Sequence, residues 1–182
     1  MIYFVGGAPR VGKTVLGERL CTKLAVGWIS TDVLADLLRM ANAPGRTMPW
    51  DATPAAITAK AEWFFPYLER FIWGITSFTD QYVIEGVHFL PAQLAKLSTH
   101  YPLRAVFLGR SRMTLEDVTR VPGRSMGYVN LPETQRRQIV EGVPHWSAFI
   151  RQEAERLGFP YVDMADDFSG RLSEAETVLT AV

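Results

Sequence analysis

The residues with the clearest chemistry form a glycine-rich run near the start of the chain. It fits the pattern G-x-x-x-x-G-K-[ST] at every fixed position and consists of Gly7, Ala8, Pro9, Arg10, Val11, Gly12, Lys13 and Thr14. The glycines let the backbone curl so that several N–H groups face one anion. Lys13 adds a positive charge for β- and γ-phosphates, and Thr14 offers a hydroxyl to Mg²⁺. The run predicts a site for nucleotide phosphates.

The segments on either side of this run have the periodicity that such a loop requires. Met1 to Val5 is a short apolar stretch rich in β-forming residues, and 13–25 has helical spacing of its apolar residues. A strand, the loop and a helix are therefore expected in that order, with the positive end of the helix directed at the phosphates.

A second candidate site residue follows the next predicted strand, 27–30. Asp32 stands at the start of a predicted helix over 31–40, where it either caps the helix or orients and deprotonates an acceptor hydroxyl near the γ-phosphate. Arg39 lies two helical turns further along the same face. It would suit a phosphate or carboxylate on the acceptor, unless it is a solvated surface arginine.

A third group follows the predicted strand 82–84. Glu85 can hold a water of the Mg²⁺ shell together with Thr14, or act as the base, and Gly86 allows close approach of a ligand to the backbone. His88 is either a substrate contact or a hydrogen-bonded packing residue. The choice of base between Asp32 and Glu85 stays open.

Six arginines are concentrated between positions 110 and 137: Arg110, Arg112, Arg120, Arg124, Arg136 and Arg137. One interpretation is a lid over about 110–137 whose arginines, Arg120 and Arg124 first, close over the transferring phosphoryl group and exclude water. The alternative is a solvated helical face whose arginines pair with Glu116, Asp117 and Glu133.

The whole chain of 182 residues alternates strand and helix, which predicts an α/β domain with a parallel sheet. Further strands are expected at 103–108 and 159–162, and a terminal helix at about 172–182. A long helix over about 55–77 is unusually aromatic, with core spacing at Phe64, Leu68, Phe71 and Ile75. Core or dimer packing is expected for it, while its other aromatic residues, with Trp50 and Asp51, are candidates to line an acceptor site.

Composition narrows the classes of protein. Lys and Arg number 19, as do Asp and Glu, so that the balanced charge argues against a broad nucleic-acid surface. No apolar run is long enough to cross a bilayer, and no secretory signal precedes the first strand, which predicts a cytoplasmic protein without a membrane partner. Cys21 is the single cysteine and is assigned no function. The sequence leaves monomer or homodimer open.

Taken together, these motifs resemble those of the P-loop kinases of the nucleoside monophosphate kinase superfamily. The phosphate loop, the segment Ile29 to Asp32, the lid pattern Arg120 to Arg124 and the last strand, Tyr161 to Asp163, carry the resemblance. It implies one domain over 1–182 with a three-layer fold, a five-stranded parallel sheet of order 2-3-1-4-5 and an acceptor-binding helical region at about 31–79. It also implies ATP with Mg²⁺ as donor and transfer of the γ-phosphoryl group.

The segment after the third strand departs from adenylate kinases. Glu85, Gly86, Val87 and His88 are similar to 2-phosphoglycerate kinase-like proteins instead, and the acceptor-reading arginine of adenylate kinases is missing. We therefore expect an ATP-dependent kinase of a small metabolite or alcohol, with a 2-phosphoglycerate-like compound as one candidate acceptor. A nucleotide-dependent regulatory ATPase and an inactive nucleotide-binding relative are the alternatives.

Overall fold

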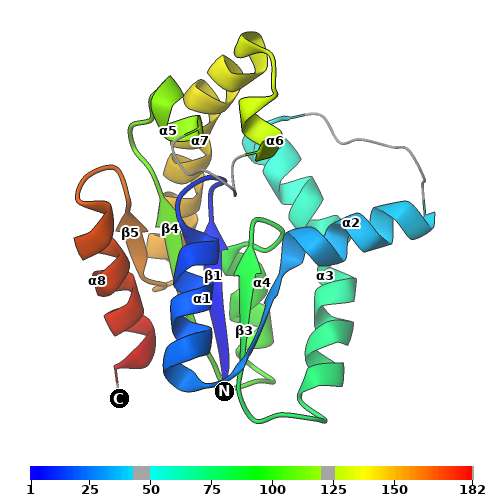
Figure 1. The fold of residues 1–182 in the computed structure, drawn as a ribbon. Coiled ribbons are helices and arrows are strands. Elements are labelled where there is room, and N and C mark those ends of the chain that lie inside the picture. Colours follow the sequence, from blue (N-terminus) through cyan, green and yellow to red (C-terminus); the bar gives the residue numbers. More distant parts are fainter. Residues whose placement is uncertain (43–49, 120–125, 182) are drawn as a thin grey trace.

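A computed structural model describes residues 1–42, 50–119 and 126–181, and its centre is a five-stranded parallel sheet (Figure 1). The strand order is β2-β3-β1-β4-β5, which confirms the predicted fold class and topology. Every neighbouring pair runs parallel. The strands are β1 (Ile2–Gly7), β2 (Gly27–Ser30), β3 (Tyr82–Gly86), β4 (Leu103–Gly109) and β5 (Tyr161–Asp163).

Helices cover both faces of this sheet. Helices α1 and α8 pack on one face, and α4 and α7 pack on the other, with α3 beside α7 (Figure 1). Among the described residues, no helix is long and apolar enough to cross a membrane. The helices are α1 (Lys13–Leu24), α2 (Thr31–Asn42), α3 (Pro54–Ile75), α4 (Pro91–Leu97), α5 (Leu115–Thr119), α6 (Met126–Val129), α7 (Glu133–Arg156) and α8 (Phe168–Thr180).

The central strand β1 is buried along its whole length, as expected for a parallel strand covered on both faces. Phe4 stacks edge-to-face on Phe89 at 5.2 Å between ring centroids, and Phe89 contacts Phe107 at 6.3 Å. The buried apolar side chains of the described residues form one continuous cluster around these rings. This cluster supports the edge of the sheet where β1, β2 and β3 end.

Several element boundaries differ from the sequence-based expectation. Helix α8 begins at Phe168, before the expected 172, because the Asp167 side chain accepts the Gly170 N–H and starts the helix early. Helix α3 begins at Pro54 because Thr53 caps it through the Ala56 N–H. On α3, Phe64 and Leu68 are fully buried as expected.

The sequence analysis did not identify the long helix α7. Its interior contains Gly142 and Pro144, both unfavourable in isolated helices. Tertiary packing explains the glycine, because a Cβ on Gly142 would stand 2.9 Å from both Ala52 and the indole nitrogen of Trp50. The close approach of the segment before α3 therefore requires a residue without a side chain here.

Candidate functional site

The glycine-rich run forms a tight loop between β1 and α1, at the carboxyl edge of the sheet (Figure 1). Gly7 and Gly12 have φ angles of 130° and 99°, which favour glycine. A Cβ on Gly7 would lie 1.9 Å from the carbonyl oxygen of Leu108 on β4. The backbone thus needs glycine at this position both for its conformation and for its contact with the neighbouring strand.

Lys13 is buried in the first turn of α1, and its Nζ donates a 2.6 Å hydrogen bond to the carbonyl oxygen of Ala8. Burial lowers the pKa of Lys13, and the positive charge of Arg10 lowers it too. The negative charges of Glu85 and Asp32 act in the opposite direction. A buried ammonium group beside a glycine-rich loop at the start of a helix is suited to phosphate oxygens.

Glu85 is the second-to-last residue of β3, beside this loop. Its carboxylate is almost fully buried, and Thr14 Oγ1 donates a hydrogen bond to Glu85 Oε1 at 3.2 Å. Burial raises the pKa of Glu85, although Lys13, Ser30 and Thr14 all favour the ionised form. The register explains the position, because Ser30 of β2 stands directly beside Glu85 of β3.

The oxygens of Thr14 and Glu85 suit Mg²⁺. This ion prefers oxygen ligands and usually keeps several waters while it binds one or two protein oxygens and substrate phosphates. Within 1–42, 50–119 and 126–181, no cluster of three or more His, Cys, Asp and Glu residues is arranged to hold a metal. A cation here would therefore share its coordination with phosphate and water.

Asp32 is the second residue of α2, and its carboxylate contacts His88. The Asp32 N–H donates to Ser30 Oγ at 3.3 Å, while the Asp32 carboxylate lies 3.1 Å from His88 Nδ1. Burial alone would raise the pKa of Asp32, but the hydrogen bond from His88 and the charges of Lys13 and Lys60 leave it lowered. Asp32 is thus an ionised carboxylate at the same edge of the sheet as the phosphate loop.

His88 joins Asp32 to Arg39. The Arg39 guanidinium lies 3.1 Å from His88 Nε2, and arginine can only donate. Nε2 must then accept, so the proton sits on Nδ1 and is donated to Asp32. The buried imidazole also stacks on Phe64 at 5.2 Å. The structure therefore brings together the three residues predicted on the acceptor side.

Arg39 has further partners that hold it in place. It pairs with Asp36 at 2.6 Å, and its guanidinium stands 5.7 Å from the centre of the Trp63 ring. Trp63, an α3 aromatic residue outside the core stripe, therefore lies next to Arg39, while its predicted part in an acceptor site stays a prediction. Trp50 instead packs against Trp146 of α7, with 5.7 Å between the ring centroids.

Lys60 is a candidate site residue that sequence reasoning missed. Burial lowers its pKa, as does the positive charge of Arg39, while Asp32 and Asp51 oppose the shift. Its Nζ lies 5.1 Å from the centre of the Trp146 ring. The sequence signal that could have identified Lys60 is its position one helical turn before Phe64, which is buried.

A second unexpected contact joins the phosphate loop to α6. Arg10 has a φ of 62°, and its guanidinium lies 4.8 Å from the centre of the Tyr128 ring. Burial raises the pKa of Tyr128; the charge of Arg10 lowers it and that of Asp32 raises it. Tyr128 is therefore within electrostatic reach of both the loop and the acceptor carboxylate.

Most described arginines of the 110–137 stretch have carboxylate partners. Arg110 pairs with Asp117 at 2.7 Å, Arg112 with Asp166 at 2.5 Å, and Arg137 with Glu133 at 2.5 Å. Two of these partners, Asp117 and Glu133, are those of the solvated-face interpretation. Arg120 and Arg124, the first candidates for a lid, lie outside the described residues.

Comparison with solved structures identifies the architecture. A gluconokinase from Sinorhizobium meliloti matches with a TM-score of 0.50 and 17% identity, over 97% of this chain and 90% of that one. A shikimate kinase from Bacteroides thetaiotaomicron matches with a TM-score of 0.52 and 17% identity, over 97% and 94%. The fold is that of the P-loop kinases. These likenesses do not separate the nucleoside monophosphate kinase and 2-phosphoglycerate kinase branches of the P-loop kinase fold.

Comparison by sequence with protein families and with curated proteins gives no match. Because the identity is only 17%, the similarity to the two kinase structures shows the fold of this chain and not its activity. The activity must therefore be argued from the arrangement of Lys13, Asp32 and Glu85.

Proposed function

We propose that this protein is an ATP-dependent phosphotransferase that moves the γ-phosphoryl group of MgATP to a hydroxyl group of a small acceptor. The observation that carries the proposal is that the glycine-rich loop with Lys13 and the start of α2 with Asp32 lie at one edge of the sheet, close enough for each charge to act on the pKa of the other. A phosphate-binding cation and an ionised carboxylate thus face a shared region. That is the arrangement needed to align a donor phosphate with an acceptor hydroxyl.

On the donor side, the backbone of the loop from Gly7 to Thr14 and the Lys13 ammonium bind the phosphates. Thr14 and Glu85 would hold Mg²⁺, which neutralises charge on the β- and γ-phosphate oxygens. Arg120 and Arg124 stay predicted as residues that close over the phosphoryl group.

On the acceptor side, Asp32 accepts a hydrogen bond from the attacking hydroxyl and so orients it. The new P–O bond forms to that oxygen, the bond to the β-phosphate oxygen breaks, and ADP leaves. Since the lowered pKa makes Asp32 a weak base, its main contribution is orientation. A loose transition state needs little deprotonation beforehand, so the hydroxyl proton passes to Asp32 only as the new P–O bond forms, and Asp32 then releases it to water.

The same side carries two cations. The positive charge of Arg39 lowers the pKa of Lys60, and Arg39 is anchored through His88. Two neighbouring, half-buried positive charges favour an anionic ligand. We therefore propose an acceptor that combines a hydroxyl with a carboxylate or phosphate, for which a 2-phosphoglycerate-like compound is one candidate. The similar structures of a gluconokinase and a shikimate kinase support small-molecule phosphorylation.

The test is incubation with MgATP and a pooled panel of nucleoside monophosphates, phosphoglycerates, hydroxy acids, sugars and simple alcohols, followed by phosphorus NMR. A new phosphorylated compound that is absent with Lys13→Ala is expected. Formation of ADP and inorganic phosphate alone would overturn the proposal in favour of a regulatory ATPase. Nucleotide binding without any turnover would overturn it in favour of an inactive relative.

A matched pair of variants then tests the acceptor carboxylate. Asp32→Asn keeps the shape but removes the charge, and we expect kcat to fall by about 10²–10³-fold. Asp80→Asn is the control, since Asp80 is an exposed residue before β3 at the opposite edge of the sheet. Equal activity of the two variants would remove Asp32 from the proposed mechanism.

A further inference from the structure

Arg10 adopts a backbone conformation that its residue type disfavours. Its φ of 62° is in the left-handed region, which costs a non-glycine residue about 1 kcal/mol or more. The phosphate-binding pattern does not require arginine at this variable position. Since non-glycine residues in this region are concentrated at functional sites, the side chain itself needs an explanation.

The side chain of Arg10 is directed toward α6, at the same edge of the sheet as the phosphate loop (Figure 1). Its guanidinium lies 4.8 Å from the centre of the Tyr128 ring, which is a cation–π contact. Both side chains are partly buried. The planar group is therefore held at the loop by an aromatic surface from a distant part of the chain.

The charges around this pair indicate that it lies near both the donor and the acceptor groups. Arg10 acts on the pKa of Lys13, the cation for the β- and γ-phosphates. Both Arg10 and Asp32 act on the pKa of Tyr128. The guanidinium of Arg10 is thus close to Lys13, and the ring on which it stacks is within electrostatic reach of Asp32.

We infer that Arg10 is a catalytic residue that contacts the γ-phosphoryl group during transfer, and that Tyr128 is its positioning residue. The inference rests on the proposed function. A planar guanidinium donates two parallel hydrogen bonds to phosphoryl oxygens and stabilises charge that spreads over them in the transition state. The phosphate loop thus supplies its own arginine in cis, and no bond to Arg10 forms or breaks.

The decisive variant is Arg10→Gly, because glycine relieves the backbone strain while it removes the charge. We expect its Tm to equal or exceed that of the unsubstituted protein, with kcat lowered about 10³-fold and the KM for ATP within about threefold. Arg19→Ala on the exposed side of α1 is the matched control. A folded Arg10→Gly protein that keeps its kcat within about threefold would overturn the inference.

A binding measurement separates this inference from the proposed function. Aluminium fluoride combines with bound MgADP to mimic a transferring phosphoryl group, and we expect it to tighten MgADP binding to the unsubstituted protein. Arg10→Gly should lose about 100-fold of that gain while its affinity for MgADP alone stays within about twofold. If no acceptor is ever phosphorylated but this difference holds, the proposed function fails and the role of Arg10 stands. If both proteins bind the mimic equally, the role of Arg10 fails.

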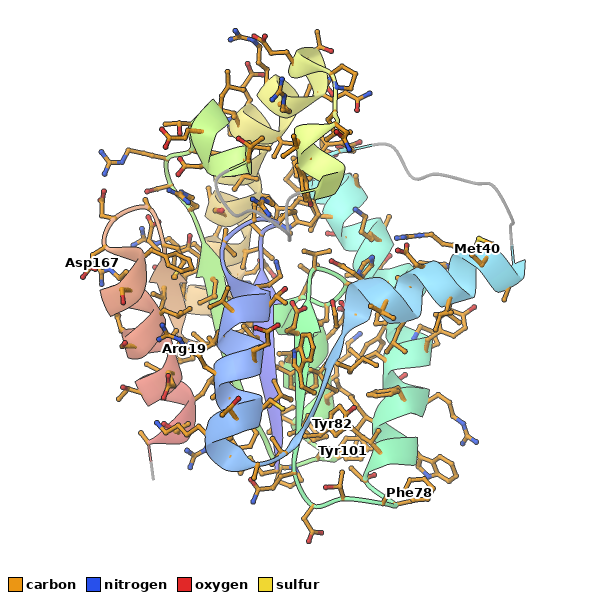
Figure 2. All side chains as sticks on the ribbon, in the orientation of Figure 1. Arg19, Met40, Phe78, Tyr82, Tyr101 and Asp167 are labelled. Carbon is orange, nitrogen blue, oxygen red and sulfur yellow. The ribbon has the colours of Figure 1, made fainter. Side chains whose placement is uncertain are left out.

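Tyr128 is tested through Arg10. We expect Tyr128→Ala to lower kcat about tenfold without changing the KM for ATP, and Tyr128→Phe to restore most of that loss because it keeps the ring. The control is Phe78→Ala, since Phe78 is 90% exposed and lies at the opposite edge of the sheet (Figure 2). In an Arg10→Gly background, Tyr128→Ala should cause no further loss. Losses that multiply would show that Tyr128 acts independently of Arg10.

Discussion

Gly86 and Thr31 lie so close that a methyl group on Gly86 would stand 1.7 Å from Thr31 Oγ1. Gly86 ends β3 with a φ of 154°, and Thr31 begins α2. The carboxylates of the proposed site, Glu85 and Asp32, are the immediate neighbours of these two residues. This close contact therefore sets how near the end of β3, which carries Glu85, lies to the start of α2, which carries Asp32.

Substitution of Gly86 should damage the fold locally. We expect Gly86→Ala to lower the free energy of unfolding by about 2–4 kcal/mol, because Thr31 is buried and has little room to move. Urea unfolding measures the change. The matched control is Gly74→Ala in α3, where a Cβ meets no atom within 4 Å, and it should be neutral or stabilising by up to about 1 kcal/mol. Equal effects of both variants would contradict the importance of the Gly86–Thr31 contact.

Glu85→Gln should weaken the use of Mg²⁺ and raise the thermal stability. The amide cannot neutralise a cation, so we expect the Mg²⁺ concentration for half-maximal activity to rise about 10–100-fold. Burial raises the pKa of Glu85, and the stability linked to its protonation is present below the unfolded pKa and lost as the pH rises through the folded pKa. Glu85→Gln should therefore gain Tm relative to the unsubstituted protein above that window.

Thermal unfolding from pH 4 to pH 8 measures this difference in Tm. Glu62→Gln, an exposed substitution on α3, is the control and should change neither the Mg²⁺ requirement nor the pH dependence of Tm. A Tm of Glu85→Gln that stays below that of the unsubstituted protein at pH 8 would refute the expected burial penalty.

Replacement of His88, which bridges Asp32 and Arg39, should weaken the use of the acceptor and leave ATP binding unchanged. His88→Ala leaves Asp32 and Arg39 without their shared partner, and we expect kcat/KM for the acceptor to fall about 10–100-fold. The KM for ATP should stay within about twofold, because the phosphate loop is untouched. Steady-state kinetics with each substrate varied gives both values. Exposed His100→Ala is the control, and a change confined to the KM for ATP would contradict the assignment.

The lowered pKa of Lys60 predicts how acceptor binding depends on pH. As the pH rises through this lowered pKa, Lys60 loses its positive charge, and the KM for an anionic acceptor should increase. Lys60→Arg should remove this alkaline rise because a guanidinium stays charged. KM measured from pH 7 to pH 10 tests the prediction, with Lys96→Arg on α4 as the control. The same alkaline rise in Lys60→Arg would assign the titration to another group.

The phosphate loop and the two carboxylates were predictable from local sequence. A run from Gly7 to Thr14 between an apolar strand and a helix requires a turn at one edge of the sheet, and Asp32 and Glu85 follow two further predicted strands. Because the carboxyl ends of parallel strands meet at one edge, their proximity to the loop follows from the fold class. Helix α7 escaped prediction because Gly142 and Pro144 obscure its pattern, and packing against Trp50 outweighs helix propensity.

The sequence by itself thus determined the fold class and the place of the glycine-rich loop between the first strand and the first helix, since both depend on local periodicity. The order of the strands was implied by the resemblance to P-loop kinases, and the structure confirms it. Only the tertiary structure decided the contacts between distant segments. His88 and Arg39 are 49 residues apart, and Tyr128 reaches Arg10 from a different helix. Such contacts depend on how helices pack over the sheet, which is set by the sum of many buried side chains rather than by any short stretch of sequence.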